Sequence, residues 1–288
     1  MKIFGIVCLA LGLVYGGYLA ALYVSQDGMV FPTRPVDQAR LAQIRTYDRN
    51  LEDWTVTAGD GTILRGYYLP RTRHGHPAPA VLSFCGNAEE QTAFFLWAAT
   101  GLPQVSLAGL DYRGYGASAG RPSERAVKAD ALVAYDALSA RLGQGVPIVV
   151  MGRSLGSGVA AYVAANRPVA GVILVTPYDS LAAVGQKRHP LAPVAALMKH
   201  PFDVLPDAAR VTAPALLLVA GADTLVPPSH AARLAEHWPG PKEVRTIDGT
   251  THATILDSPE YWPAIRTFLN RLFPDPAGSA IAQTRDAQ

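Results

Sequence analysis

The sequence predicts an α/β protein built on a doubly wound, mostly parallel sheet of about eight strands. Short, uninterrupted apolar runs alternate with segments of helical pattern along most of the chain. Strands that are apolar along their whole length are buried on both faces, which is typical of a parallel sheet with helices on each side. A chain of 288 residues is long enough to bury one large core of this kind.

The expected strands begin with a hairpin and continue as apolar runs. An Asp-Gly turn at residues 60–61 separates two alternating segments, which predicts an antiparallel hairpin. The segments expected as strands are residues 53–57, 63–69, 80–84, 105–110, 148–151, 169–175, 213–220 and 243–247. Helical patterns cover residues 36–44, 89–99, 123–142, 155–166 and 258–272. The helix over 123–142 carries a capping pattern at its start.

The centre of this pattern is Gly152-Arg153-Ser154-Leu155-Gly156, between a β-branched run and an alanine-rich helical segment. Gly-x-Ser-x-Gly in this setting is typical of a nucleophile elbow, a strained turn that projects the serine hydroxyl from the sheet. A side chain at Gly152 or Gly156 would collide with a neighbouring strand or helix where these approach the turn. Ser154 is therefore the candidate nucleophile, and the alternative is a strand-to-helix turn without chemistry.

A serine hydroxyl needs a base in contact with it and an acid that orients the base. Asp223 follows a buried strand 69 residues after the serine, and His252 follows the next strand 29 residues later. Because parallel strands end at one edge of the sheet, we expect Asp223 to be the acid and His252 the base. Asp179 and Asp248 are rival acids, but we expect Asp179 to cap the start of a lid and Asp248 to lie in a turn.

The other histidines of the chain are weaker candidates for the base. Of the seven histidines, His252 alone follows a strand near the end of the expected fold. The others fall in a loop, in the lid and on the helix after Asp223. They are His74, His76, His189, His200, His230 and His237.

An acyl-transfer site also needs N–H donors for the oxyanion. We expect them to be the backbone N–H groups of Leu155, at the start of the helix, and of Asn87, in the loop after residues 80–84. Cys85 in the same loop is predicted to be a small buried hydrophobic residue rather than a reactive thiol. Arg113, in the glycine-containing loop 111–116, is expected to brace neighbouring turns.

The amino-terminal segment is the most apolar part of the chain. Residues 3–24 carry no charge and would extend roughly 33 Å as a helix, enough to cross the hydrocarbon core of a bilayer. The length of the run, its tyrosines and the lack of an Ala-x-Ala site before Ser25 favour an uncleaved anchor over a signal peptide. Only Met1 and Lys2 precede it, which predicts a single-pass protein with its catalytic domain on the periplasmic or extracellular side.

These observations divide the chain into four parts. We expect a transmembrane anchor over residues 1–24, a connector over 25–50, a catalytic domain over 51–273 and a flexible tail over 274–288. A proline-rich stretch within the domain, residues 178–210, is the expected lid.

Composition excludes several classes of function. The formal net charge is +2 and no run of five like charges occurs, so nucleic-acid binding has no electrostatic support. Cys8 lies in the anchor and Cys85 at the expected sheet edge, so we expect no disulfide between them. The sequence contains no Cys-x-x-Cys or His-Glu-x-x-His, and neither a metal nor an organic cofactor is expected.

Several motifs occur in a fixed order along residues 25–273. They are Cys85–Ala88, Tyr112–Glu124, Gly152–Gly156, Thr176–Leu181 and Gly221–Pro227. Together they resemble the α/β-hydrolase superfamily, and more narrowly its membrane-anchored serine hydrolases, a group that includes protein depalmitoylases. The resemblance implies the α/β-hydrolase fold with a short lid. It also implies Ser154 as nucleophile, Asp223 as acid, His252 as base, and Asn87 with Leu155 as oxyanion donors.

The sequence departs from this family at one position of the first motif. Cys85 stands where the family usually has a histidine that orients the loop, so we expect an altered shape of the site with catalysis retained.

We therefore expect a serine hydrolase that cleaves an ester or thioester of a small-molecule or lipid-like acyl substrate through an acyl-enzyme. Two other functions stay open at this point. One is a small peptidase or amidase of the same fold. The other is a catalytically inactive, membrane-tethered binding module, which Cys85 alone favours.

Overall fold

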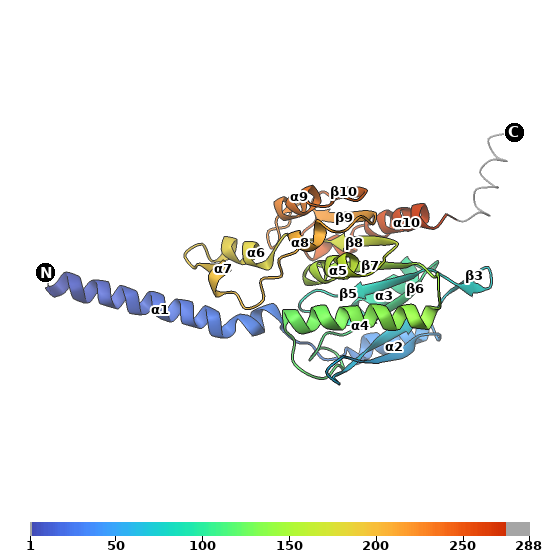
Figure 1. Ribbon diagram of the computed structural model, residues 1–288, viewed down its shortest axis with the longest axis horizontal. Helices are drawn as coiled ribbons and strands as arrows, with labels where there is room; N and C mark the ends of the chain where they lie inside the picture. Colours follow the sequence, from blue (N-terminus) through green and yellow to red (C-terminus); the bar gives the residue numbers. More distant parts are fainter. Residues whose placement is uncertain (1, 275–288) are drawn as a thin grey trace.

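The computed structural model describes residues 2–274, which fold around an eight-stranded sheet covered by helices on both faces (Figure 1). The strands of this sheet are β1 (Glu52–Thr57), β2 (Ile63–Leu69), β5 (Ala80–Phe84), β6 (Ser106–Leu110), β7 (Ile148–Arg153), β8 (Gly171–Val175), β9 (Ala215–Ala220) and β10 (Lys242–Ile247). Their order is β1-β2-β6-β5-β7-β8-β9-β10. β2 runs antiparallel to β1 and β6, and the other neighbours are parallel. The predicted fold class is confirmed.

Helices cover each face of this sheet and enclose two separate cores. One core joins α2 (Gln38–Tyr47), α3 (Gln91–Gly101) and α10 (Tyr261–Leu272) to the sheet. The other joins α4 (Glu124–Leu142), α5 (Leu155–Asn166), α8 (Leu205–Ala208) and α9 (Pro228–Glu236) to the opposite face. β7 and β8 are buried between them, which explains why they read as continuous apolar runs.

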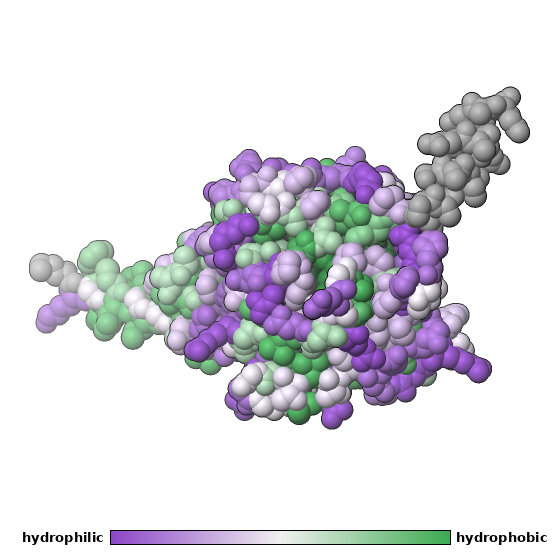
Figure 2. Space-filling view, turned by 45° about the vertical axis from the view of Figure 1, so that its right-hand side comes forward, coloured by the Kyte–Doolittle hydropathy of each residue, from purple (hydrophilic) through white to green (hydrophobic). Residues whose placement is uncertain are grey.

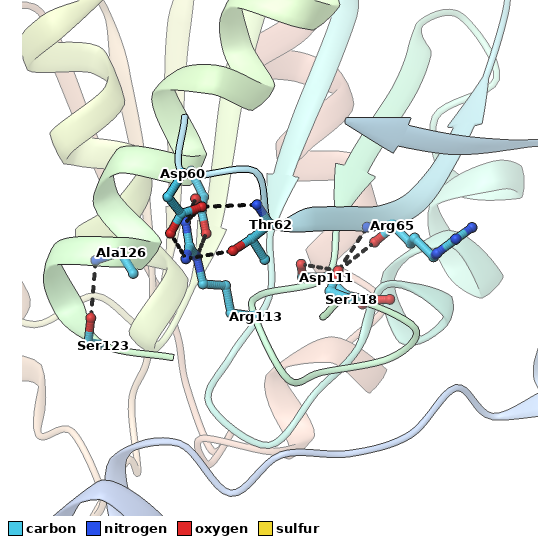
Figure 3. Close-up of polar contacts among 9 residues, drawn as sticks. Asp60, Thr62, Arg65, Asp111, Arg113, Ser118, Ser123 and Ala126 are labelled. Atoms are coloured by element: carbon cyan, nitrogen blue, oxygen red, sulfur yellow. Dashed lines mark hydrogen bonds and ion pairs between the residues drawn. The ribbon is translucent and has the colours of Figure 1, made fainter. Parts of the chain in front are cut away.

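Local sequence signals set where several elements begin. Ser123 caps α4 by accepting a hydrogen bond from the N–H of Ala126 at 3.2 Å (Figure 3). Asp37 caps α2 in the same way through the N–H of Arg40. The segment between β2 and β5 contains a short antiparallel ribbon of β3 (Thr72–Arg73) and β4 (His76–Pro77).

Arg113 ties the first hairpin to α4. Its guanidinium bonds Asp130 of α4 at 2.6 and 2.7 Å, and it also bonds Asp60 and Thr62 in the turn between β1 and β2 (Figure 3). The pair of carboxylates raises the pKa of Arg113 and keeps it charged. Arg113 therefore braces neighbouring segments, as expected.

The amino-terminal helix is longer than predicted. α1 (Lys2–Val30) continues six residues beyond the expected end of the anchor at residue 24, so the predicted connector begins as helix. The hydroxyl of Ser25 donates to the carbonyl of Ala21 at 2.7 Å, and buried Gln26 contacts the lid, which together stabilise this extension. α1 is long and apolar enough to cross a membrane, a property that signal sequences share.

The expected lid, residues 178–210, contains α6 (Leu181–Arg188), α7 (Val194–Leu197) and α8. In Figure 1, α6 and α7 lie on the side of the domain from which α1 projects. A 3-10 turn (Thr254–Asp257) and α10 follow β10 and close the fold. The predicted tail, apart from Pro274, lies outside the described residues.

Candidate active site

Ser154 lies on a sharp turn between β7 and α5. Its backbone has φ 50° and ψ −119°, in the positive-φ region that costs a residue with a side chain about 1–3 kcal/mol. A Cβ at Gly152 would overlap the carbonyl oxygen of Gly156, and a Cβ at Gly156 would overlap the carbonyl oxygen of Phe84. The predicted collision is therefore present at both glycines, and only glycine lets β7, α5 and β5 approach this closely.

The structure brings Ser154, Asp223 and His252 together in one chain of hydrogen bonds. Nε2 of His252 lies 2.9 Å from Oγ of Ser154, and Nδ1 lies 2.7 Å from Oδ2 of Asp223. The three residues follow β7, β9 and β10, whose carboxyl ends share one edge of the sheet. A histidine held between a carboxylate and a serine hydroxyl can accept the hydroxyl proton while the carboxylate stabilises the resulting charge.

Asp223 is only 5% exposed, yet it is held in its ionised form. Burial by itself would raise the pKa of its carboxyl group, but the hydrogen bonds from His252 and from the N–H groups of Val226 and Leu225 outweigh it. Those two N–H groups both lie 2.9 Å from Oδ1, which leaves Oδ2 for the histidine. The net pKa of Asp223 lies below its ordinary value, so the group is a carboxylate at neutral pH.

Asn87 and Leu155 line the same cavity as Ser154. Leu155 is the first residue of α5, where backbone N–H groups face the start of the helix. The backbone of Asn87 is held in place by a hydrogen bond that its carbonyl oxygen accepts from the hydroxyl of Tyr115 at 2.5 Å. Both residues expected to supply the oxyanion donors thus line the cavity that contains the serine.

Arg153 connects three segments of the site, a role that the sequence analysis missed. Its Nη2 donates to the carbonyl oxygen of His252 at 2.7 Å, and its Nη1 forms an ion pair with Glu89. Glu89 in turn accepts the N–H of Gly86 at 2.8 Å. The elbow, the histidine loop and the loop of the expected oxyanion donor are therefore linked through one guanidinium. The sequence contains a hint of this role, because Arg153 is a charged residue beside the serine and Glu89 is an acidic residue in the loop after β5.

Cys85 is a buried residue of that loop. It is 8% exposed, and burial is the main reason that the pKa of its thiol lies well above the ordinary value. A thiol kept protonated is a poor nucleophile, which agrees with the prediction of a buried hydrophobic residue. Its carbonyl oxygen accepts a hydrogen bond from the hydroxyl of Tyr112 at 2.9 Å, which helps to hold the loop.

The rival acids lie in other surroundings. Oδ1 of Asp179 lies 2.7 Å from Nδ1 of His230, and its other oxygen lies 3.3 Å from Arg233, both on α9. The expectation that Asp179 caps the lid is wrong. The cap of α6 is Ser180, whose hydroxyl accepts the N–H of Ala183 at 3.0 Å, while the Asp179 carboxylate contacts His230 and Arg233 of α9. Asp248 precedes Gly249, which has φ +70°, and so lies in a turn as expected.

The cavity at Ser154 has a volume of about 1000 Å³, including space open to solvent. Its far wall comes from the lid helix α6 and from the last two residues of α1, Met29 and Val30. The remaining wall contains Leu225 and Val226, which follow Asp223. The cavity surface is mostly apolar, which suits a substrate with an acyl group.

This fold, with a serine elbow, a histidine and an aspartate at neighbouring strand ends, defines a hydrolase of the α/β class. A profile of the family described as serine hydrolase matches residues 134–271, which include all three residues. An uncharacterized protein of Mycobacterium tuberculosis is 37% identical over 222 residues, covering 75% of this chain and 78% of the relative. The alpha/beta hydrolase domain-containing protein WAV2 of Arabidopsis thaliana is 28% identical, covering 92% and 93%.

Solved structures share the fold at low sequence identity. An alpha-beta hydrolase from Vibrio vulnificus has a TM-score of 0.69 at 19% identity, covering 84% of this chain and 91% of that chain. The esterase Pf2001 of Pyrococcus furiosus has a TM-score of 0.64 at 19% identity, covering 84% and 96%. The chain belongs to the α/β-hydrolase superfamily, and within it to the serine hydrolases.

Proposed function

We propose that Ser154, His252 and Asp223 form a catalytic triad that hydrolyses a carboxylic ester or thioester through an acyl-enzyme. The observation that carries the proposal is His252, which lies 2.9 Å from the serine hydroxyl and 2.7 Å from the carboxylate. Because Asp223 is ionised and held by three donors, it fixes the ring with Nε2 toward the serine.

In this mechanism Nε2 of His252 takes the proton of Ser154 as Oγ attacks the carbonyl carbon of the substrate. The carbonyl oxygen becomes negative and is held by the backbone N–H groups of Leu155 and Asn87. The C–O or C–S bond then breaks, and the imidazolium gives its proton to the leaving alkoxide or thiolate. A water molecule, deprotonated by His252, attacks the acyl-enzyme, and Ser154 recovers its proton as the carboxylic acid leaves.

The proposed substrate is a small-molecule or lipid-like acyl compound, since the cavity at Ser154 is large and mostly apolar.

We also propose that α1 stays uncleaved as a single membrane anchor, with the catalytic domain on the non-cytoplasmic side. External protease applied to intact cells, or to spheroplasts where an outer membrane is present, should then digest the domain, and a domain that spheroplasts protect until lysis would overturn this orientation.

The triad is tested by labelling with a fluorophosphonate and by hydrolysis of p-nitrophenyl butyrate. Ser154→Ala should abolish labelling and lower kcat/KM by on the order of 10³-fold or more. The matched control is Ser229→Ala, because Ser229 is an exposed serine on α9. Labelling that survives in Ser154→Ala would overturn the assignment. Ester hydrolysis no faster than that of Ser154→Ala would favour the inactive binding module instead.

A further inference from the structure

The end of α1 and the lid are joined by a set of polar contacts. The side chain of Gln26 donates to the carbonyl oxygen of Leu197 at 3.2 Å and accepts the N–H of Lys199 at 2.6 Å. Asp27, one residue later, lies 3.4 Å from Nζ of Lys199 and 3.2 Å from Nε2 of His200. Because Gln26 is 8% exposed, its two hydrogen bonds are partly shielded from water and position the lid on α1, whereas the Asp27 contacts are exposed.

The lid also contacts α1 about two to three turns earlier, within its apolar stretch. The hydroxyl of Tyr15 donates to the carbonyl oxygen of Leu191 at 2.7 Å, and that of Tyr18 lies 3.2 Å from Nδ1 of His189. The side chain of Leu191 is 77% exposed beside these tyrosines. Figure 2 shows apolar surface along the projecting part of α1. Because both tyrosines lie within residues 3–24, insertion of α1 in a bilayer would carry the tip of the lid into the membrane.

An apolar seam runs between α1 and the lid into the cavity at Ser154. A second cavity, of about 480 Å³, follows α1 as far as Leu22, with Leu197 of α7 on its opposite wall. It adjoins the Ser154 cavity, with which it has five lining residues in common. The shared residues are Met29, Val30, Gly185, His189 and Met198. One end of the seam is thus the nucleophile, and the other end is the apolar face of α1.

We propose that this seam binds the acyl chain of an ester that resides in the membrane, and that α1 is a wall of the substrate site as well as an anchor. The proposal rests on the esterase function proposed above and specifies its substrate as a long-chain acyl ester. The carbonyl group would reach Ser154 while the chain lies between Leu22 of α1 and Leu197 of α7.

The seam removes a barrier that a membrane-resident substrate would otherwise meet. Drawing an acyl chain out of a bilayer through water exposes apolar surface, which is unfavourable, whereas lipid tails and an apolar groove are similar surroundings. From Leu22 to Val30 the helix rises roughly 12 Å, which is more than a butyryl group occupies. Short acyl groups would therefore use only the cavity at Ser154, and long ones would also enter the seam.

The experiment fills the seam from each wall in turn. Leu22→Trp and Leu197→Trp are made in the full chain, reconstituted in phosphatidylcholine vesicles. The matched control is Val24→Trp, since Val24 is 75% exposed on the same helix and lines neither cavity. For each protein, kcat/KM is measured for p-nitrophenyl palmitate in the vesicle and for p-nitrophenyl butyrate in solution.

Both seam variants should lower the ratio of palmitate to butyrate activity by about tenfold or more, and the control should keep the wild-type ratio. Equal loss of both activities in the two seam variants, or a ratio that falls as far in Val24→Trp, would overturn the seam as a chain-binding site. If the wild-type protein hydrolyses neither ester faster than Ser154→Ala, the proposed function itself fails. Butyrate turnover in each variant reports whether it is folded.

Discussion

The molecule contains two buried aspartate–histidine pairs of nearly equal geometry. Asp223 lies 2.7 Å from His252, and Asp179 lies 2.7 Å from His230. In both pairs burial would raise the pKa of the aspartate, and hydrogen bonds led by the histidine outweigh it and lower the pKa. The pairs differ in what faces the second ring nitrogen. Nε2 of His252 faces the hydroxyl of Ser154, whereas the described residues provide no serine, threonine or cysteine partner for Nε2 of His230.

This comparison shows that a buried aspartate beside a histidine can serve either a structural role or the proposed catalytic role in the same molecule. In the Asp179 pair it joins the start of the lid to α9, and Arg233 adds a second contact at 3.3 Å. In the Asp223 pair the same arrangement orients a histidine toward a nucleophile on a strained turn. The elbow, rather than the pair, therefore distinguishes the candidate active site from a structural contact.

The largest expected difference between the pairs is in catalysis. His252→Ala should lower kcat/KM for p-nitrophenyl butyrate by on the order of 10³-fold or more, because the serine loses its base. His230→Ala should retain activity within about tenfold, since its ring contacts neither the nucleophile nor the oxyanion donors. Steady-state kinetics of folded, purified variants check this. A loss of similar size in both variants would show that the second pair also takes part in the reaction.

The second expected difference is in stability. Asp179→Ala should lower the free energy of unfolding by about 3 kcal/mol, since it leaves His230 without its partner in a buried position. The matched control is Asp136→Ala, whose carboxylate is 53% exposed in a pair with Arg167 and should cost less than about 1 kcal/mol. Urea unfolding of the full chain in detergent measures both. If the two variants lose equal amounts of unfolding free energy, the buried pair of Asp179 with His230 contributes no more to stability than the exposed pair does.

The sequence predicts most of the fold because the sheet depends on local signals. Apolar runs bounded by glycine, proline and polar residues place each strand of the large sheet close to its observed position. The candidate triad could be predicted for the same reason, since Ser154, Asp223 and His252 each follow such a run. The role of Asp179 could not, because its partner His230 is 51 residues away on α9 and no local pattern links them.

The contacts of α1 show the same limit more clearly. Hydropathy places the end of the anchor near residue 24, where the apolar run stops. The helix continues to Val30 because Gln26 and Asp27 contact lid residues more than 170 positions later in the chain. Arg153 likewise reads only as the variable residue of the elbow, although it links Glu89 to the carbonyl oxygen of His252. Long-range polar contacts of this kind require the folded structure.

Asp111 offers a further comparison, because it is a buried aspartate without a histidine partner. Asp111 follows β6 and is 4% exposed, with its Oδ1 accepting the N–H of Gln91 at 2.7 Å. Burial raises the pKa of Asp111 to about 7, against a lowered pKa in both histidine pairs. The neighbouring Glu90 adds to the rise, and the hydrogen bond from Gln91 opposes it.

The raised pKa of Asp111 should make stability fall as the pH rises. Between the ordinary pKa near 4 and about 7, the folded chain keeps a proton on Asp111 that the unfolded chain has lost. The free energy of unfolding due to this group should then decrease by up to about 1.4 kcal/mol per pH unit and level off above that range.

Asp111→Asn removes the titration, so the difference in unfolding free energy between wild type and variant should show this slope in urea titrations from acidic to neutral pH. Asp136→Asn, on the surface, serves as control and should show no decrease over the same interval. Parallel curves for wild type and Asp111→Asn would mean that Asp111 is ionised in the folded chain, and that a buried aspartate here needs no histidine to hold its charge.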